Sequence, residues 1–211
     1  MHSIAKSVVG VGVVVMLELC GMQASPASQV IISDPLTSWP LNFGPQQGAY
    51  VLLKDGAVHI VEPSNTANWA VYSGFEFTDM EASVTITPQT ATGNGAGLIF
   101  WSSGTTTDFF VVNVLDPSGA FAIYRHLSAN GGSWQTLLAS TPNAAVKSGA
   151  GAANTLRIVT KGNSVSVFIN GQSMGTLALL APSGGGTVGI YAEGQADKPA
   201  DYVFSNITVS Q

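Results

Sequence analysis

Residues 164–171 read Ser-Val-Ser-Val-Phe-Ile-Asn-Gly, and this stretch gives the clearest fold signal in the chain. The two valines and the isoleucine point to one side of an extended chain and the serines to the other, because side chains alternate along a β-strand. Only Phe168 falls outside the pattern. Asn170-Gly171 tolerates positive φ at both positions, which a tight hairpin turn requires. The stretch therefore predicts a half-buried strand that ends in a turn.

The segment before it has a complementary pattern. Residues 155–160 place Leu156 and Ile158 on one face, and Lys161-Gly162-Asn163 supplies a turn between the two apolar runs. We therefore expect an antiparallel hairpin within residues 154–177.

Short apolar runs of the same kind continue in both directions along the chain. They are Tyr50–Leu53, Val58–Val61, Ala82–Thr87, Gly97–Trp101, Phe109–Leu115, Ala120–His126, Trp134–Leu138, Thr155–Thr160, Ser164–Asn170, Thr187–Glu193 and Tyr202–Val209. Runs at about 8–12 residue spacing with intervening turns are typical of a sandwich or barrel. Ala144–Ala153 reads as a loop, and Gly93–Gly97 as a turn, because its glycines precede a strand and not a helix. The fold class predicted is an all-β, two-sheet antiparallel sandwich.

Composition excludes several classes of protein. The chain has 211 residues, of which 45% are hydrophobic and only 9% charged, against about 25% charged in typical domains. Disorder needs lower hydrophobicity or more net charge, and helical bundles need more Glu, Lys, Leu and Arg. Seven Lys and Arg against twelve Asp and Glu give a net charge of −5. Without a basic patch, we expect no nucleic-acid partner.

The first 27 residues resemble a secretory signal peptide, which leaves residues 28–211 as a single domain. Val8–Leu17 is an apolar run of Val, Gly, Met and Leu, and a small-residue pattern ends at Ala27. The run is too short for a transmembrane helix, which needs about 20 residues. We therefore expect no transmembrane span and a secreted or periplasmic protein. A lipoprotein attached through Cys20, the one cysteine, is the minor alternative.

The order of the strand segments resembles a known superfamily. The segments that carry the resemblance are Gly97–Trp101, Phe109–Val114, Ala120–Arg125, Trp134–Leu137, Leu156–Gly171, Val188–Ala192 and Tyr202–Ile207. Together they resemble the concanavalin A-like lectin/glucanase superfamily over residues 36–211, with laminin G-like domains and 3-keto-disaccharide hydrolase-type domains as the nearest groups. The resemblance implies a jelly roll with one concave sheet. Its motifs are core residues and turns, so they point to fold more than to activity.

Acidic pairs for hydrolysis are scarce. Glucanases of the superfamily carry Glu-x-Asp-x-x-Glu, whereas this chain has Glu76, Asp79 and Glu81 in a different order. That segment reads as a turn that enters an edge strand. His59 and His126 are expected on strand surfaces. We therefore assign no catalytic residue and lean against an enzyme.

The sequence predicts no metal site and no cofactor. No His or Cys spacing suits zinc. A structural calcium ion is a minor alternative, and its oxygen ligands would come from Asp108, Asn113, Asp116 or Asp201.

Alternation within the strands separates a core set from an outward set. The core set is Leu98, Phe100, Val112, Val114, Phe121, Ile123, Leu156, Ile158, Val167, Val188 and Ile190. The outward set is Ile99, Trp101, Asn113, Ala122, Tyr124, Tyr191 and Glu193. Within this set, Trp101, Asn113, Tyr124, Tyr191 and Glu193 form the predicted ligand-binding site, since aromatic rings stack on sugars and polar groups orient hydroxyls. The alternative is that loops cover these residues. Trp39, Trp69 and Trp134 are expected to pack or anchor loops.

The leading functional hypothesis is a secreted, non-catalytic module that binds carbohydrate or a glycoconjugate through the concave sheet. A glycoside hydrolase of the 3-keto-disaccharide type is the second hypothesis, and a structural or adhesive envelope protein the third. An enzyme needs converging acidic groups in a pocket. A binding module needs exposed aromatic side chains there.

Overall fold

The computed structural model describes residues 28–103, 108–129 and 132–211, so the predicted signal peptide lies outside the described residues. Strands dominate this part of the chain. They are β1 (Val30–Asp34), β2 (Val51–Lys54), β3 (Ala57–Glu62), β4 (Ala67–Val71), β5 (Met80–Pro88), β6 (Gly93–Ser102), β7 (Phe109–Leu115), β8 (Ala120–Leu127), β9 (Ser133–Pro142), β10 (Asn154–Lys161), β11 (Ser164–Ile169), β12 (Gln172–Ala178), β13 (Thr187–Gly194) and β14 (Ala200–Ser210). One 3₁₀ turn, η1 (Asp116–Ser118), joins β7 to β8.

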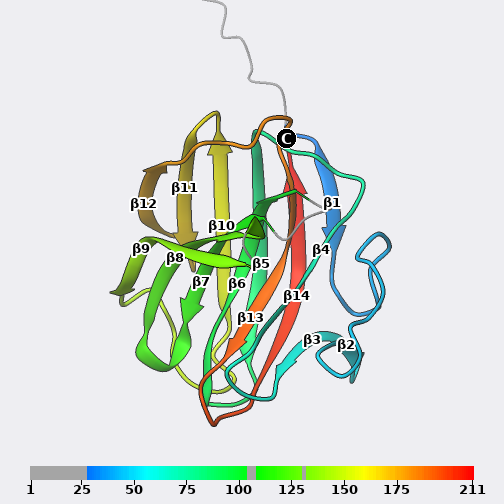
Figure 1. Ribbon diagram of the computed structural model, residues 1–211, viewed down its shortest axis with the longest axis vertical. Coiled ribbons are helices and arrows are strands. Elements are labelled where there is room, and N and C mark those ends of the chain that lie inside the picture. Colours follow the sequence, from blue (N-terminus) through cyan, green and yellow to red (C-terminus); the bar gives the residue numbers. More distant parts are fainter. Residues whose placement is uncertain (1–27, 104–107, 130–131) are drawn as a thin grey trace, which may run out of the picture.

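The strands form two antiparallel sheets packed face to face (Figure 1). The eight-stranded sheet has the order β12-β11-β10-β5-β14-β3-β2, with β1 paired to β14. The six-stranded sheet has the order β4-β13-β6-β7-β8-β9. This arrangement confirms the predicted two-sheet jelly-roll sandwich. Within the described residues, no helix has the length and apolar character that crossing a bilayer requires.

The core lies between the two sheets and is built from alternating strand residues. Every member of the predicted core set is buried. Leu98, Phe100 and Ile123 of the six-stranded sheet and Leu156 and Ile158 of the other sheet have no exposed surface. The alternation of apolar residues therefore identified the inward faces of both sheets.

The hairpin predicted between residues 154 and 177 is present as β10, β11 and β12. Leu156 lies opposite Ile169 in the β10–β11 ladder. Asn170 has a φ of 50° and Gly171 a φ of 80°, so the dipeptide turns the chain into β12 as expected. The Asn170 side chain accepts a hydrogen bond from the Thr155 backbone and donates to the Ala145 carbonyl. These bonds connect the turn to the neighbouring loop.

Three strands and one strand position differ from the sequence prediction. β1, β4 and β12 were not among the predicted apolar runs, although β12 lies within the predicted hairpin segment. β1 and β12 have little apolar alternation, whereas the alternation in β4 was overlooked. The acidic segment Glu76–Glu81 was predicted to enter an edge strand. This was wrong, because β5 lies between β10 and β14 in the middle of its sheet. There Glu81 forms an ion pair with Arg157 of β10, at 3.1 Å.

Gly93–Gly97 is the first half of β6 and not a turn, which corrects a second prediction. Its glycines fit where a side chain would not. A Cβ on Gly97 would lie 2.4 Å from the Val112 carbonyl oxygen, and one on Gly93 would collide with the Tyr202 ring. Glycine in a strand often marks such a close approach, and here it does not break the strand.

Trp101 faces the core, so its prediction as an outward residue was wrong. Opposite Thr187 and Gly189 of β13, strand β6 has one extra residue between Ile99 and Ser102. Trp101 has a φ of 49° at this bulge. The bulge breaks the period of two, so Trp101 packs beside Phe100 and donates a hydrogen bond from Nε1 to the Thr78 carbonyl.

Candidate functional site

The outer face of the six-stranded sheet is strongly concave. Trp134 of β9 and Tyr191 of β13 are four places apart in the sheet, roughly 19 Å if the sheet were flat. Their ring centroids are nevertheless only 5.5 Å apart. Trp69 of β4 likewise lies 5.6 Å from His126 of β8, also four places away. Side chains from the two edges of the sheet therefore meet above its centre.

An aromatic wall forms where these side chains meet, and we define it as Trp69, Phe109, His126 and Trp134. The His126 ring stacks on Phe109 at 5.2 Å and contacts Trp134 at 4.7 Å. Because the other three rings of the wall contact it, His126 is only 7% exposed, which corrects its prediction as a surface residue. Trp134 is 44% exposed and forms the outer edge of the wall.

A polar cluster of Asn113, Tyr191 and Glu193 lies beside the wall, near the C-terminal end of β13. The Asn113 side chain of β7 donates a hydrogen bond to Glu193 Oε1 at 2.9 Å, and the Tyr191 hydroxyl donates to Glu193 Oε2 at 3.0 Å. Strand β6 separates β7 from β13, and its residues here are Gly95 and Gly97. Because these glycines have no side chain, Asn113 and Glu193 can meet above β6.

A second carboxylate approaches the cluster from the other sheet. Glu62, at the end of β3, is fully buried and accepts hydrogen bonds from Thr66 and Asn68 through Oε2. A Cβ on Gly194 would lie 3.0 Å from Glu62 Cβ, so the absence of that side chain lets Glu62 pack against the end of β13.

Burial raises the pKa of both glutamates. Desolvation is the main cause for Glu193, opposed by the hydrogen bonds from Tyr191 and Asn113. Desolvation also raises the pKa of Glu62, and the negative charge of Glu193 raises it further. Desolvation and the Glu193 charge raise the pKa of the Tyr191 and Tyr124 hydroxyls as well. Two carboxyl groups with raised pKa values can take up or release protons nearer to neutral pH than exposed ones.

An open pocket of about 420 Å³, which we call the Tyr124 pocket, includes Leu115 and Gln195, two residues beyond Asn113 and Glu193 in the sequence. Tyr124 is half-buried and contacts Trp134 at 6.3 Å. The other lining residues are Gly93, Asn94, Leu115, Pro117, Ser118, Ser140 and Gln195. The pocket combines one aromatic side chain with several hydroxyl and amide groups, and its volume lies within the usual range for small-molecule sites.

The structure brings four of the five predicted site residues together. Asn113, Tyr124, Tyr191 and Glu193 share the concave face, whereas Trp101 lies in the core. Asn113 and Tyr191 are almost fully buried there. The alternative expected loops to cover these residues, whereas a contact that covers Tyr191 comes from the strand side chain of Trp134, at 5.5 Å. Tyr124 keeps part of its surface exposed.

The sequence reasoning missed Trp69, Trp134 and Glu62 as members of this site. Trp69 lies on β4, which was not predicted as a strand, although Ala67, Trp69 and Val71 follow a period of two. Trp134 reaches the site only because the sheet curves. Glu62 reaches it only because the two sheets pack together, so no local pattern indicated it.

The oxygen-bearing residues considered for calcium do not share a site. Asp108 accepts hydrogen bonds from Ser128, Asp116 accepts one from the Tyr202 hydroxyl, and Asp201 pairs with His59 at 2.6 Å. Through this contact His59 is buried, which corrects its prediction as a surface residue. In the described part of the chain, no three His, Cys, Asp or Glu residues are grouped so as to hold a metal ion.

The concave sheet and its polar cluster define the class of protein. Two antiparallel sheets, one of them concave with aromatic and acidic side chains on its outer face, make this a jelly roll of the concanavalin A-like kind. Residues 34–210 match the model of the 3-keto-alpha-glucoside-1,2-lyase-like domain family. The chain belongs to this family.

Solved structures with the same fold support the class. Carbohydrate-binding module CBM66 from Bacillus subtilis superposes with a TM-score of 0.59 and 16% identity, over 73% of this chain and 86% of that one. Bacillus licheniformis β-glucanase gives a TM-score of 0.57 and 12% identity, over 87% and 98% of the two chains. A Bacillus subtilis protein of unknown function with a galectin-like fold gives a TM-score of 0.63 and 12% identity, over 86% of this chain and 96% of that one. No curated protein matches the sequence significantly.

Proposed function

We propose that this protein is a secreted or periplasmic, non-catalytic module that binds carbohydrate on the concave face of its six-stranded sheet. The Tyr124 pocket is the observation that carries the proposal, because it joins a half-exposed aromatic ring to a set of small polar side chains. The family match and the fold shared with a carbohydrate-binding module support it.

In this proposal, Tyr124 and Trp134 provide apolar surfaces for the C–H face of a pyranose ring. Both rings keep part of their surface exposed, and their centroids are 6.3 Å apart. Ser118, Ser140 and Gln195 line the same pocket and can exchange hydrogen bonds with hydroxyl groups of the sugar. Glu193 and Asn113 lie next to this pocket on the same face, and the hydrogen bond between them fixes the position of both side chains.

A glycan array on the mature protein, followed by calorimetric titration with the best ligand, tests the proposal. We expect Tyr124→Ala to weaken binding at least about tenfold, equivalent to about 1.4 kcal/mol, and Trp134→Ala to weaken it as well. Tyr50→Ala is the matched control, since Tyr50 is an exposed tyrosine before β2. Absence of any bound glycan, or equal losses in the Tyr50 variant, would refute the proposal.

A second candidate function is the elimination named by the family, which the paired glutamates favour. In a 3-keto-glycoside, the proton on C2 is acidified by the neighbouring ketone. A carboxylate such as Glu193 would take this proton, the electron pair would form the C1–C2 double bond, and the C1–O bond would break. The leaving oxygen would take the same proton back from Glu193, because the raised pKa of Tyr124 makes its hydroxyl a poor acid. The raised pKa of Glu193 makes it a stronger base than an exposed glutamate.

Turnover of 3-keto-disaccharides by purified protein separates the two candidates. The binding proposal expects no product from the wild type, and a small loss of glycan affinity in Glu193→Gln, because this change alters the hydrogen bonds with Asn113 and Tyr191. Turnover that disappears in Glu193→Gln would replace the binding module with a lyase.

A further inference from the structure

A second pocket of about 410 Å³ lies at the opposite end of β6 and β13 from the Tyr124 pocket. We call it the Phe75 pocket. Its lining residues are Tyr72, Ser73, Gly74, Phe75, Glu76, Ser102, Ser103, Gly185 and Gly186. Gly93 of the first pocket and Ser102 of the second begin and end β6, which places the pockets roughly 30 Å apart. The two pockets are therefore separate sites.

Close backbone contacts build the floor of the Phe75 pocket. Phe77 and Gly186 exchange two backbone hydrogen bonds, of 2.9 and 3.1 Å, which join the β4–β5 loop to the β12–β13 loop. A Cβ on Gly186 would lie 2.5 Å from the Trp101 carbonyl carbon, and one on Gly185 would lie 2.7 Å from the Phe77 backbone. Only glycine allows the three segments to approach this closely. The bulge at Trp101 directly precedes Ser102 and Ser103 and so helps to place them at the pocket.

The Phe75 ring is held in place from two sides. It stacks on Phe77 with a centroid distance of 6.0 Å and an interplanar angle of 8°, and it meets Tyr72 edge-on at 6.3 Å. The ring is still partly exposed. A fixed aromatic ring at a pocket wall needs little ordering when a ligand stacks on it.

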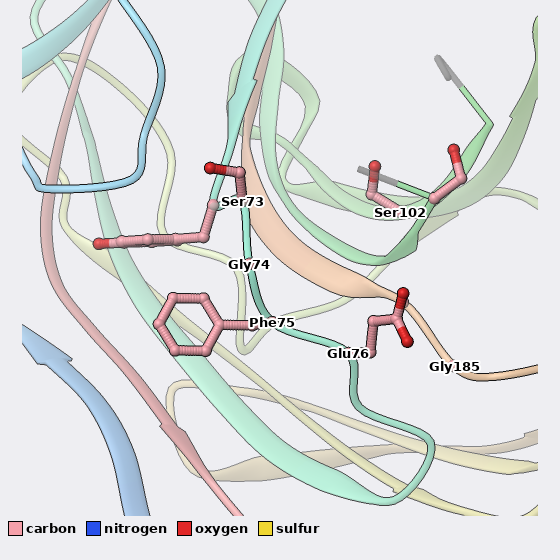
Figure 2. A pocket seen from close by; sticks show the side chains of 9 residues that line it. Ser73, Gly74, Phe75, Glu76, Ser102 and Gly185 are labelled. Atoms are coloured by element: carbon pink, nitrogen blue, oxygen red, sulfur yellow. The ribbon is translucent and has the colours of Figure 1, made fainter. Parts of the chain in front are cut away.

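Glu76 gives the pocket its charge. Figure 2 shows its carboxylate turned toward the side where Ser102 lies, whereas the Phe75 ring extends to the other side of the same loop. The side chain is exposed, and the salt bridges found among the described residues do not include it. Lysine, arginine and histidine are absent from the described lining residues. The pocket thus has an acidic group, an aromatic wall and several hydroxyl groups, a combination that disfavours anionic ligands.

We propose that the Phe75 pocket is a second ligand site, which takes a pyranose unit that carries a protonated amine. Phe75 stacks against the apolar face of the ring, and the Glu76 carboxylate accepts hydrogen bonds from the ammonium group. The Ser73 hydroxyl, which already donates to the Asn42 carbonyl, can accept a hydrogen bond from a sugar hydroxyl. An exposed ion pair makes binding only modestly more favourable. The site therefore binds an amino sugar about fivefold more tightly than a neutral sugar.

The test is a ¹H–¹⁵N NMR titration of the full protein with methyl glycosides of glucosamine, glucose and glucuronic acid. A pH of about 6 keeps the amine protonated. We expect the glucosaminide to shift the amides of Phe75 and Glu76, to bind about fivefold more tightly than the glucoside, and the glucuronide not to bind there. Glu76→Gln should bind glucosaminide and glucoside equally, since it keeps the shape and loses the charge. Phe75→Ala should lose both.

Two variants test this proposal separately from the concave-face function. Tyr124→Ala should leave the shifts at Phe75 and Glu76 unchanged, whatever it does to the first pocket. Glu76→Gln replaces an exposed side chain and should fold even if Phe75→Ala does not. Equal affinity for glucosaminide and glucoside in the wild type, an unchanged preference in Glu76→Gln, or shifts confined to the Tyr124 pocket would each overturn the proposal.

Discussion

At the scale of single residues, the concave face depends on where side chains are absent. Asn113 and Glu193 form a hydrogen bond above strand β6 because Gly95 and Gly97 leave the space free. At the β6 bulge, Trp101 has a positive φ, and its side chain therefore packs in the core and not on the face of the ligand site. Neither effect follows from residue type alone, because both depend on what the neighbouring strand places nearby.

Replacement of Gly97 by alanine should therefore destabilise the fold. Its Cβ would lie 2.4 Å from the Val112 carbonyl oxygen and 2.7 Å from Val111 Cγ2, so one of the strands must move. We expect a loss of about 1–3 kcal/mol in the free energy of unfolding, measured by urea titration. Thr136→Ala on the exposed strand β9 serves as control and should change little. Equal unfolding midpoints for Gly97→Ala and wild type would show that the strands have room to separate.

At the scale of elements, the core strands are specified by alternation and should respond to truncation accordingly. Phe121 of β8 lies between the sheets, 3% exposed. Phe121→Ala should lower the free energy of unfolding by about 3–5 kcal/mol, because it removes buried surface and leaves a cavity. Calorimetry or urea unfolding measures the loss, and Tyr50→Ala, at an exposed aromatic side chain, should lose far less. A loss below about 1 kcal/mol would mean that β8 has its faces reversed.

The same alternation predicted much of the candidate site, and its failures have definite causes. Asn113, Tyr124, Tyr191 and Glu193 face the concave side as predicted, because their strands keep an uninterrupted period of two up to those positions. Trp101 does not, because the β6 bulge shifts the period by one residue. A bulge depends on the pairing with β13, which a local pattern does not contain.

At the scale of the whole molecule, two buried carboxyl groups and the partly buried Glu193 make the stability of the fold depend on pH. Desolvation is the main cause of the raised pKa of Glu62, Asp116 and Glu193. Between their ordinary pKa values and the raised ones, the folded chain binds more protons than the unfolded chain. The stabilising contribution is therefore complete below the ordinary values and is lost as the pH rises through the raised ones.

We thus expect the urea midpoint to be higher at about pH 5 than at about pH 7.5. Glu193→Gln should reduce this difference, because it removes one of the three titrating groups and keeps the shape of the side chain. Asp55→Asn removes one charge from an exposed turn between β2 and β3 and should leave the difference almost unchanged. A midpoint that rises with pH in the wild type would contradict the assignment of these carboxyl groups.

The predicted maturation also belongs to this scale. The apolar run Val8–Leu17 and the small residues up to Ala27 predict a mature chain that begins near Ser28. N-terminal sequencing of exported protein is the measurement. Retention of Met1 would exclude cleavage, and a lipid on Cys20 would favour the lipoprotein alternative.

The sequence by itself determined the sandwich, the inward faces of its strands and the β10–β11 hairpin, because a period of two and the turn residues Lys161-Gly162-Asn163 are local properties of the chain. Tertiary structure alone decided which outward residues meet. The curvature of the six-stranded sheet brings Trp134 to Tyr191, and the packing of the two sheets brings Glu62 to the end of β13. The contact between Phe77 and Gly186 likewise forms the Phe75 pocket from loops far apart in the sequence. Curvature, bulges and sheet packing are set by long-range pairing, which a strand's own residues do not encode.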